Sequence, residues 1–199
     1  AKYNELVIEV DDIKPKFVLL TETWLSGDMP NALVSLSSYT IFRKNRVGSR
    51  GGGVCIFVNN QILSQFVVTP LGAQTLGIES LFLKIQSRTN MFVLGSIYRP
   101  PNSQLDNDGF TFKVLGVIAA TYKELFLFGD FNMPDISWST NILSSSNASS
   151  QLMVNLLSDS HLSHLSQVID KPTRFRRNQR PSTPDLVLTF DEKSIRYQY

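Results

Sequence analysis

LFLFGDFN, residues Leu125–Asn132, is an apolar run that stops abruptly at a glycine, an aspartate and an asparagine. Such a run predicts a buried strand that delivers polar groups to its carboxyl end. In layered α/β proteins, functional side chains collect where the strands leave the sheet. Asp130 and Asn132 are therefore the first candidates for a functional site.

Asp130 and Asn132 carry complementary chemistry. A carboxylate can accept a proton or face a cation, and a carboxamide can donate to an anionic oxygen, so the pair suits a phosphate ester. The alternative interpretation is a strand that ends in an Asx turn, with Gly129 permitting the bend. Taken alone, the octapeptide leaves both interpretations open.

The composition is that of an ordinary globular domain. The 199 residues are 42% hydrophobic and 18% charged, which suits one domain with a sizeable core. No apolar run approaches the roughly 20 residues of a membrane span, and no signal-peptide pattern occurs. Cys55 is the only cysteine, which excludes an internal disulfide and a cysteine-cluster zinc site and fits a reducing, intracellular compartment. Its apolar neighbours predict a small core residue.

Helical and strand patterns alternate along the chain. Apolar residues at helical spacing predict an amphipathic helix over 3–13 and further helices around 114–122 and 152–157. Strands are predicted over 17–20, 39–43, 53–58, 79–85, 91–98, 125–132 and 185–190. Polar, glycine-rich connections predict that 39–43 pairs with 53–58, and a short polar turn predicts an antiparallel hairpin over 79–98.

Polar side chains also flank three other strands. Glu22 comes just past the first strand, where it is either a ligand for a hard divalent cation such as Mg²⁺ or a capping or surface residue. Tyr98 can donate to a phosphate oxygen, and Arg99 can neutralise one or pair with a carboxylate. Asp185 begins the last strand, either as a cap or as an orienting acid.

Two stretches are rich in cations and contain no acid. Such clusters can follow a phosphate backbone, and the alternative is a pair of solvated basic loops. The first stretch holds Arg43, Lys44, Arg46 and Arg50, and the second holds Lys171, Arg174, Arg176, Arg177 and Arg180.

Four separated motifs together fit one known pattern. They are TETWL at 21–25, YRPP at 98–101, GDFN at 129–132 and PDLVL at 184–188. On these motifs the chain resembles the endonuclease/exonuclease/phosphatase superfamily, and more narrowly the apurinic-type endonuclease domain of non-LTR retrotransposons. RGGGV at 50–54 and QVIDKPTR at 167–174 are similar to that subgroup, and the order and spacing agree over nearly the whole chain.

The resemblance implies a single domain over residues 1–199. Its fold would be a four-layer α/β sandwich, in which two mixed, mostly antiparallel sheets pack face to face and helices flank them. It also implies that Glu22 binds the divalent metal, Mg²⁺ or Mn²⁺. Arg46, Arg50, Arg99, Arg174, Arg176 and Arg177 are the expected DNA contacts.

The resemblance assigns four further roles by motif. Tyr98 would contact the scissile phosphate, Asp130 would align or activate the attacking water, and Asn132 would hold a phosphate oxygen. Asp185 matches the acid that orients the catalytic histidine of the family. These roles are coherent with in-line attack of water on a phosphodiester.

Two departures from the family pattern stand out. The family carries an asparagine on a strand ahead of the first helix, and Asn4 lies too far into that helix to match it. The family's histidine belongs to a Ser-Asp-His motif after the strand at Asp185, and neither His161 nor His164 stands there. We therefore expect a domain truncated at both ends, which lacks the first strand and the last histidine-bearing strand and, with them, a metal-shell asparagine and the phosphate-facing histidine. Exposed sheet edges and apolar faces would make it poorly stable or oligomeric.

The implied function is divalent-metal-dependent phosphodiester hydrolysis that nicks DNA in the nucleus. The partner in the same polypeptide would be a C-terminal reverse transcriptase domain, and no membrane is involved. One alternative is a phosphatase or phospholipase of the same superfamily, and another is a noncatalytic truncated remnant that binds nucleic acid. The basic clusters and the 167–174 segment favour the nuclease over the phosphatase.

Overall fold

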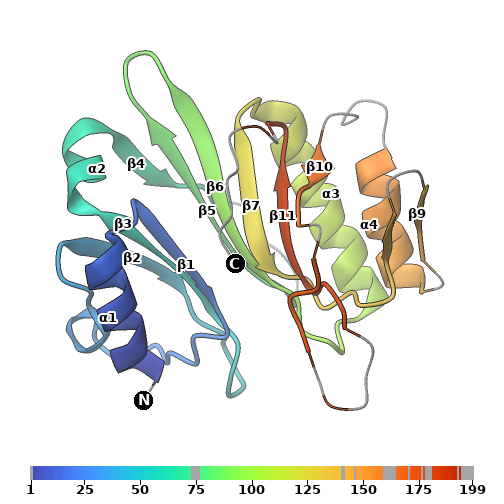
Figure 1. The fold of residues 1–199 in the computed structure, drawn as a ribbon, viewed down its shortest axis with the longest axis horizontal. Helices are drawn as coiled ribbons and strands as arrows, with labels where there is room; N and C mark the ends of the chain where they lie inside the picture. The colour runs from blue at the N-terminus through green and yellow to red at the C-terminus, as the bar shows by residue number, and fades with distance from the viewer. Residues whose placement is uncertain are drawn as a thin grey trace.

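The computed structural model describes residues 2–72, 77–139, 142–145, 147–158, 165–169, 171–175, 177, 181–191 and 193. Within these residues the chain forms two sheets flanked by helices, which confirms the expected fold class (Figure 1). Helix α1 (Lys2–Ile13) covers the smaller sheet, and helices α3 (Leu105–Thr121) and α4 (Ala148–Ser158) cover the larger one. Arg176, Arg180, His161 and His164 lie outside the described residues.

The smaller sheet has the strand order β1-β3-β2 and is antiparallel throughout. Its strands are β1 (Phe17–Thr21), β2 (Tyr39–Lys44) and β3 (Val54–Asn59). The predicted pairing of the second and third of these strands is confirmed. The central strand β3 is an uninterrupted apolar run because it is covered on both faces.

The larger sheet has the order β10-β11-β7-β6-β5-β4. Among the described strands only β6 and β7 pair in parallel, because α3 carries the chain from the end of one strand back to the start of the other. The predicted hairpin of β5 with β6 is confirmed. The strands are β4 (Val67–Pro70), β5 (Glu79–Gln86), β6 (Met91–Tyr98), β7 (Leu125–Asp130), β10 (Ser166–Gln167) and β11 (Asp185–Thr189).

Three apolar clusters separate the layers. The cluster between the sheets includes Phe17, Phe92 and Phe126, whose rings meet edge to face with centroids 6.1 Å apart for both successive pairs. A second cluster joins α1 to the smaller sheet and contains Cys55, and the third joins the larger sheet to α3 and α4. Burial raises the pKa of the Cys55 thiol to about 12, so the prediction of a core cysteine is confirmed.

Several short elements are additional to those predicted. A 3₁₀ turn, η1 (Asn31–Val34), follows the first strand, and α2 (Asn60–Gln65) begins where the Asn59 side chain accepts from the Gln61 amide at 2.9 Å. Strands β8 (Ser137–Ser139) and β9 (Ile142–Ser144) form a separate hairpin. None of the helices in the described ranges has the length and apolar character needed to cross a membrane.

Candidate active site

Strand register gathers three of the predicted site residues at one edge of the larger sheet. Tyr98 ends β6 and lies beside Asp130 in the parallel pair, and Asp185 lies opposite Asp130 in the antiparallel pair of β11 with β7. Gly129 makes this convergence possible, since a Cβ atom there would lie 1.9 Å from the carbonyl oxygen of Ile97. Gly129 therefore permits close approach of the strands, where the sequence suggested a bend.

Asp130 and Asn132 are buried and joined through Arg174. The Nη2 atom of Arg174 donates to Oδ2 of Asp130 at 3.1 Å and to Oδ1 of Asn132 at 3.0 Å. The backbone amide of Asn132 donates to Oδ1 of Asp130 at 3.0 Å, so the Asx turn is also present. The Asx turn of the alternative interpretation is therefore observed, and the functional role of Asp130 and Asn132 stays a prediction.

The Asn132 side chain is fixed at both ends. Its Oδ1 accepts from Arg174, and its Nδ2 donates to the carbonyl of Arg99 at 2.9 Å. The backbone of Asn132 has a φ of 48°, in the left-handed region that asparagine tolerates better than most residues. The Asn132 amide also hydrogen-bonds to the Asp130 carboxyl, which lowers the pKa of that group.

The environment of Asp130 raises the pKa of its carboxyl group. Burial and, next, the neighbouring Asp185 raise the pKa of Asp130, while Arg174 and the hydrogen bonds from Asn132 act in the opposite direction. The net result is a pKa above the ordinary value of 3.8. A carboxylate with a raised pKa accepts a proton more readily near neutral pH, as a general base requires.

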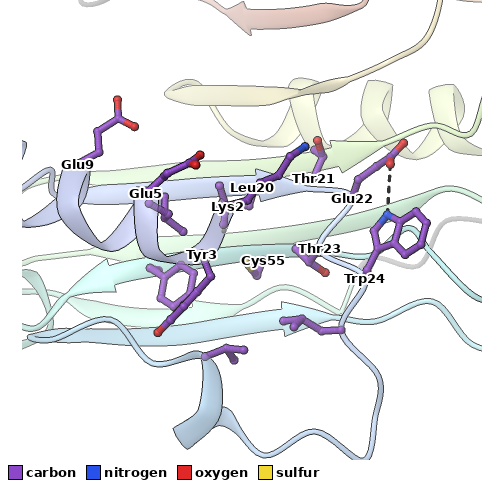
Figure 2. A pocket seen from close by; sticks show the side chains of 14 residues that line it. Lys2, Tyr3, Glu5, Glu9, Leu20, Thr21, Glu22, Thr23, Trp24 and Cys55 are labelled. Carbon is purple, nitrogen blue, oxygen red and sulfur yellow. Dashed lines mark hydrogen bonds between the residues drawn. The ribbon is translucent and has the colours of Figure 1, made fainter.

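Glu22 lies on the other sheet, just past the end of β1. It stands at one end of a cavity of about 780 Å³ between α1 and the smaller sheet (Figure 2). Interaction with the Tyr98 hydroxyl is the largest influence and lowers the pKa of Glu22, against a smaller effect of burial. The indole Nε1 of Trp24 also donates to Oε2 of Glu22 at 3.3 Å. Glu22 is therefore an ionised, exposed carboxylate beside a phenol.

Tyr98 connects Glu22 of the smaller sheet with Asp130 of the larger sheet. Its pKa is raised, first by burial and then by the hydrogen bond to Glu22 and the charge of Glu22, with Asp130 contributing in the same direction. Tyr98 consequently remains a protonated donor across the physiological range. The sequence identified this residue, and the structure places it between the carboxylates of the two sheets.

Arg46 supports Tyr98. Its guanidinium pairs with Glu79 through Nε to Oε1 at 2.6 Å and Nη2 to Oε2 at 3.1 Å, and lies 5.6 Å from the centre of the Tyr98 ring. Gly52 lies directly against this guanidinium, where a Cβ atom would come within 2.5 Å of its central carbon. Two of the expected DNA-binding donors are thus occupied by Glu79, a residue that the sequence did not single out.

Arg99 does not serve as the expected DNA contact. The residue is only 5% exposed, and its guanidinium forms a two-point ion pair with the fully buried Asp108 at 2.9 and 2.8 Å. A third nitrogen donates to the carbonyl of Asn132 at 3.2 Å. The physical reason is that Asp108, in the first turn of α3, is buried near the end of β6. Its carboxylate pairs with the Arg99 guanidinium there, so Arg99 points into the protein. Arg99 therefore holds the Asn132 loop.

Arg50 and Arg177, two further predicted contacts that the structure describes, lie on the surface. Arg50 is exposed and stands over the Trp24 ring at 5.5 Å, and Arg177 is exposed as well. The side chain of Asp185 is also exposed, and its backbone amide donates to Oγ1 of Thr173 at 3.3 Å. These positions leave Arg50 and Arg177 available to a phosphate backbone.

The donor set suits a cation that keeps much of its water. Among the described residues, no three His, Cys, Asp or Glu side chains form a metal-binding group. Mg²⁺ needs only one or two carboxylates when waters and substrate phosphates complete its octahedron. The ionised, exposed Glu22 can be such a carboxylate. The described residues do not suit a metal ion that protein ligands alone would enclose.

Comparisons with known proteins point to the same kind of domain. A family model described as endonuclease-reverse transcriptase matches residues 92–198, slightly more than half of the chain. This range includes the strand ends that carry Tyr98, Asp130 and Asp185. No curated protein sequence matches the chain.

Three solved structures share the fold. The endonuclease domain of TRAS1, a telomere-specific non-LTR retrotransposon, superposes with a TM-score of 0.64 at 19% identity, covering 94% of this chain and 78% of that one. A 3′-5′ exonuclease (NExo) from Neisseria meningitidis gives 0.66 at 15% identity, covering 94% and 80%. D. rerio TDP2 complexed with a single-strand DNA product gives 0.61 at 13% identity, covering 98% and 78%.

Proposed function

The chain belongs to the endonuclease-reverse transcriptase family, within the endonuclease/exonuclease/phosphatase superfamily, and on that premise we propose that it hydrolyses phosphodiester bonds in DNA with the help of a divalent metal ion. The observation that carries the proposal is the placement of Tyr98 between the ionised Glu22 and the buried Asp130. One carboxylate is suited to a cation and the other to a proton.

Each side chain has a distinct task in this proposal. Asp130 accepts the proton of the attacking water, which its raised pKa favours. When substrate binds, the Tyr98 hydroxyl would turn from Glu22, and the Asn132 amide from Asp130, to donate to oxygens of the scissile phosphate, where negative charge develops. Arg174 lies against both Asp130 and Asn132 and adds a fixed positive charge at that place.

Glu22 would hold Mg²⁺ or Mn²⁺ together with water and phosphate oxygens. When bound, the ion supplies positive charge that offsets the charge of the phosphate. The exposed Arg50 and Arg177 would contact the DNA backbone on either side. The expected products are a 3′-hydroxyl and a 5′-phosphate. A nick of this kind supplies the primer that a reverse transcriptase domain in the same polypeptide would extend in the nucleus.

The test is nicking of supercoiled plasmid by this chain, with Mg²⁺ or with EDTA. We expect nicks only with Mg²⁺, and we expect Asp130→Asn to lower the rate about 10²- to 10⁴-fold, the usual effect of losing a general base. Asp12→Asn on the exposed face of α1 is the matched control and should nick like the unchanged chain.

Two other substrates distinguish the alternatives. Hydrolysis of a small phosphate monoester without plasmid nicking would favour a phosphatase. Salt-dependent DNA binding with no hydrolysis of either substrate would favour a noncatalytic nucleic-acid-binding domain.

A further inference from the structure

Trp24 is a large apolar side chain that the fold leaves in solvent beside the proposed site. It is 57% exposed, although tryptophan buries more apolar area than any other side chain when it enters a core. Its indole nitrogen donates a hydrogen bond to Glu22, the carboxylate that we propose to hold the cation. Single exposed apolar side chains are common on protein surfaces, so the exposure of Trp24 matters here because the ring lies beside Glu22 and next to the Arg50 guanidinium.

The backbone around Trp24 is strained in a way that sets the direction of the ring. Glu22 and Trp24 have φ values of 51° and 56°, in the left-handed region that side-chain-bearing residues rarely adopt. The amide of Trp24 donates to the carbonyl of Gly52 at 2.9 Å, and that of Thr23 donates to Gly53 at 3.3 Å. The glycine-rich loop thus holds the segment in place.

The ring is also held from the side. The Arg50 guanidinium stands 5.5 Å from the ring centre, and Gly51 lies beside the ring, where a Cβ atom would make an ordinary van der Waals contact with Cε2 at 3.6 Å. The exposure of the ring nevertheless shows that much of its surface stays open. Trp24 and Arg50 therefore present a preoriented aromatic surface with an attached positive charge.

We propose that Trp24 and Arg50 form a stacking platform for an unpaired nucleobase next to the phosphate that is cut. The inference rests on the proposed function and adds to it a preference for a nucleotide that is single-stranded, frayed or turned out of the duplex. A base offers a flat π-face to the indole, while its phosphate is drawn to the guanidinium. A paired base within a duplex is already stacked on both faces and cannot use this surface.

Stacking on aromatic rings does not depend on the identity of the base. The platform would therefore select the state of the nucleotide, unpaired rather than paired, and would not read sequence. A purely local role for Trp24, orienting Glu22 through the indole nitrogen, predicts no dependence of binding on the presence of a base.

The experiment measures fluorescence anisotropy of two labelled oligonucleotides of equal length in EDTA, which prevents cutting. One is single-stranded DNA, and the other has the same backbone with abasic residues throughout. Trp24→Ala should weaken binding of the first about 5-fold or more and leave binding of the second unchanged. Trp24→Phe, which keeps a ring but loses the N–H donor, should retain most of the affinity for the first.

Phe110→Ala is the matched control, because Phe110 is also exposed, at 42%, but lies on α3. It should change neither affinity. Intrinsic fluorescence of the unchanged chain gives a second test, which does not depend on whether the alanine variant folds. Trp24 and Trp138 are its two tryptophans, and the base-containing strand should quench emission while the abasic strand does not.

Equal loss of affinity for both oligonucleotides, or no loss for either, would overturn the stacking proposal while leaving the nuclease proposal in place. Failure of the unchanged chain to bind either oligonucleotide would instead overturn the DNA-directed function, and the platform with it.

Discussion

The Arg174 guanidinium lies 3.1 Å from Oδ2 of Asp130, which places a fixed cation against a carboxyl group whose burial favours the neutral form. Arg174 therefore tunes the residue that we propose as the general base. Without this charge, only the hydrogen bonds from Asn132 would oppose the effects of burial and of Asp185 on the pKa of Asp130.

Arg174→Gln should raise the pKa of Asp130 further, because it removes the charge that lowers it. The acidic limb of the pH–rate profile for nicking should move to higher pH. Stability should respond too. The folded chain binds a proton at Asp130 more readily than the unfolded chain, so stability falls as pH rises from 3.8 through the folded pKa, and the variant should enlarge that fall. Arg177→Gln is the control, and an unshifted limb in Arg174→Gln would contradict the assignment.

Glu22→Gln should weaken the response to metal. The neutral amide keeps the size of the side chain but loses the ionised oxygen that a hard cation prefers. We expect the Mg²⁺ concentration for half-maximal nicking to rise about tenfold or more, and titration calorimetry with Mg²⁺ should show the same loss. Glu5→Gln offers a matched comparison, since Glu5 lines the same cavity from α1. Identical Mg²⁺ affinities for Glu22→Gln and the unchanged chain would exclude Glu22 as the ligand.

Asp108→Ala should destabilise the fold by about 3–5 kcal/mol, because it leaves the buried Arg99 guanidinium without its partner. Urea unfolding measures this cost. The double variant Arg99→Met with Asp108→Leu should recover much of the stability, since the buried charge is then absent. Its nicking rate should stay low, because Arg99 also supports the Asn132 loop. A small cost for the single variant would show that the pair is not buried in solution.

Gly129→Ala should destabilise the chain by about 1–3 kcal/mol, since its Cβ would lie 1.9 Å from a backbone oxygen of β6 and the strands must separate. The nicking rate should fall with stability, because the same register aligns Tyr98 and Asp130. Gly27→Ala is the control, as a Cβ atom there meets nothing within 4 Å. Equal unfolding midpoints for the two variants would argue against the close approach.

The sequence predicted most of the layered fold because the long strands carry clear patterns. LFLFGDFN ends as expected in a buried strand and a polar loop. Strand β4 was not predicted because it is short and ends at Pro70, and β8 and β9 have only three residues each. Local pattern carries little signal over such lengths.

The sequence indicated polar residues at the strand ends, and it did not indicate which side chains pair with one another. Arg46 and Glu79 are 33 residues apart, and no pattern in the sequence indicates that they form an ion pair. The sequence left Arg99 either to neutralise a phosphate or to pair with a carboxylate. The structure shows the pairing, and its partner Asp108 could not be predicted because the packing of α3 brings it near. The surroundings of Trp24 depend on positive φ values, which neither Glu22 nor Trp24 suggests by its residue type.

The two halves of the proposed site belong to different sheets, with Glu22 following β1 and Asp130 ending β7. The aromatic rings of Phe17, Phe92 and Phe126 fill the space between those sheets. The thickness of that apolar layer therefore sets the span between the carboxylate suited to a cation and the carboxyl suited to a proton. Replacing one of these rings with a smaller side chain, far from any polar group, would change the gap into which a phosphate must fit.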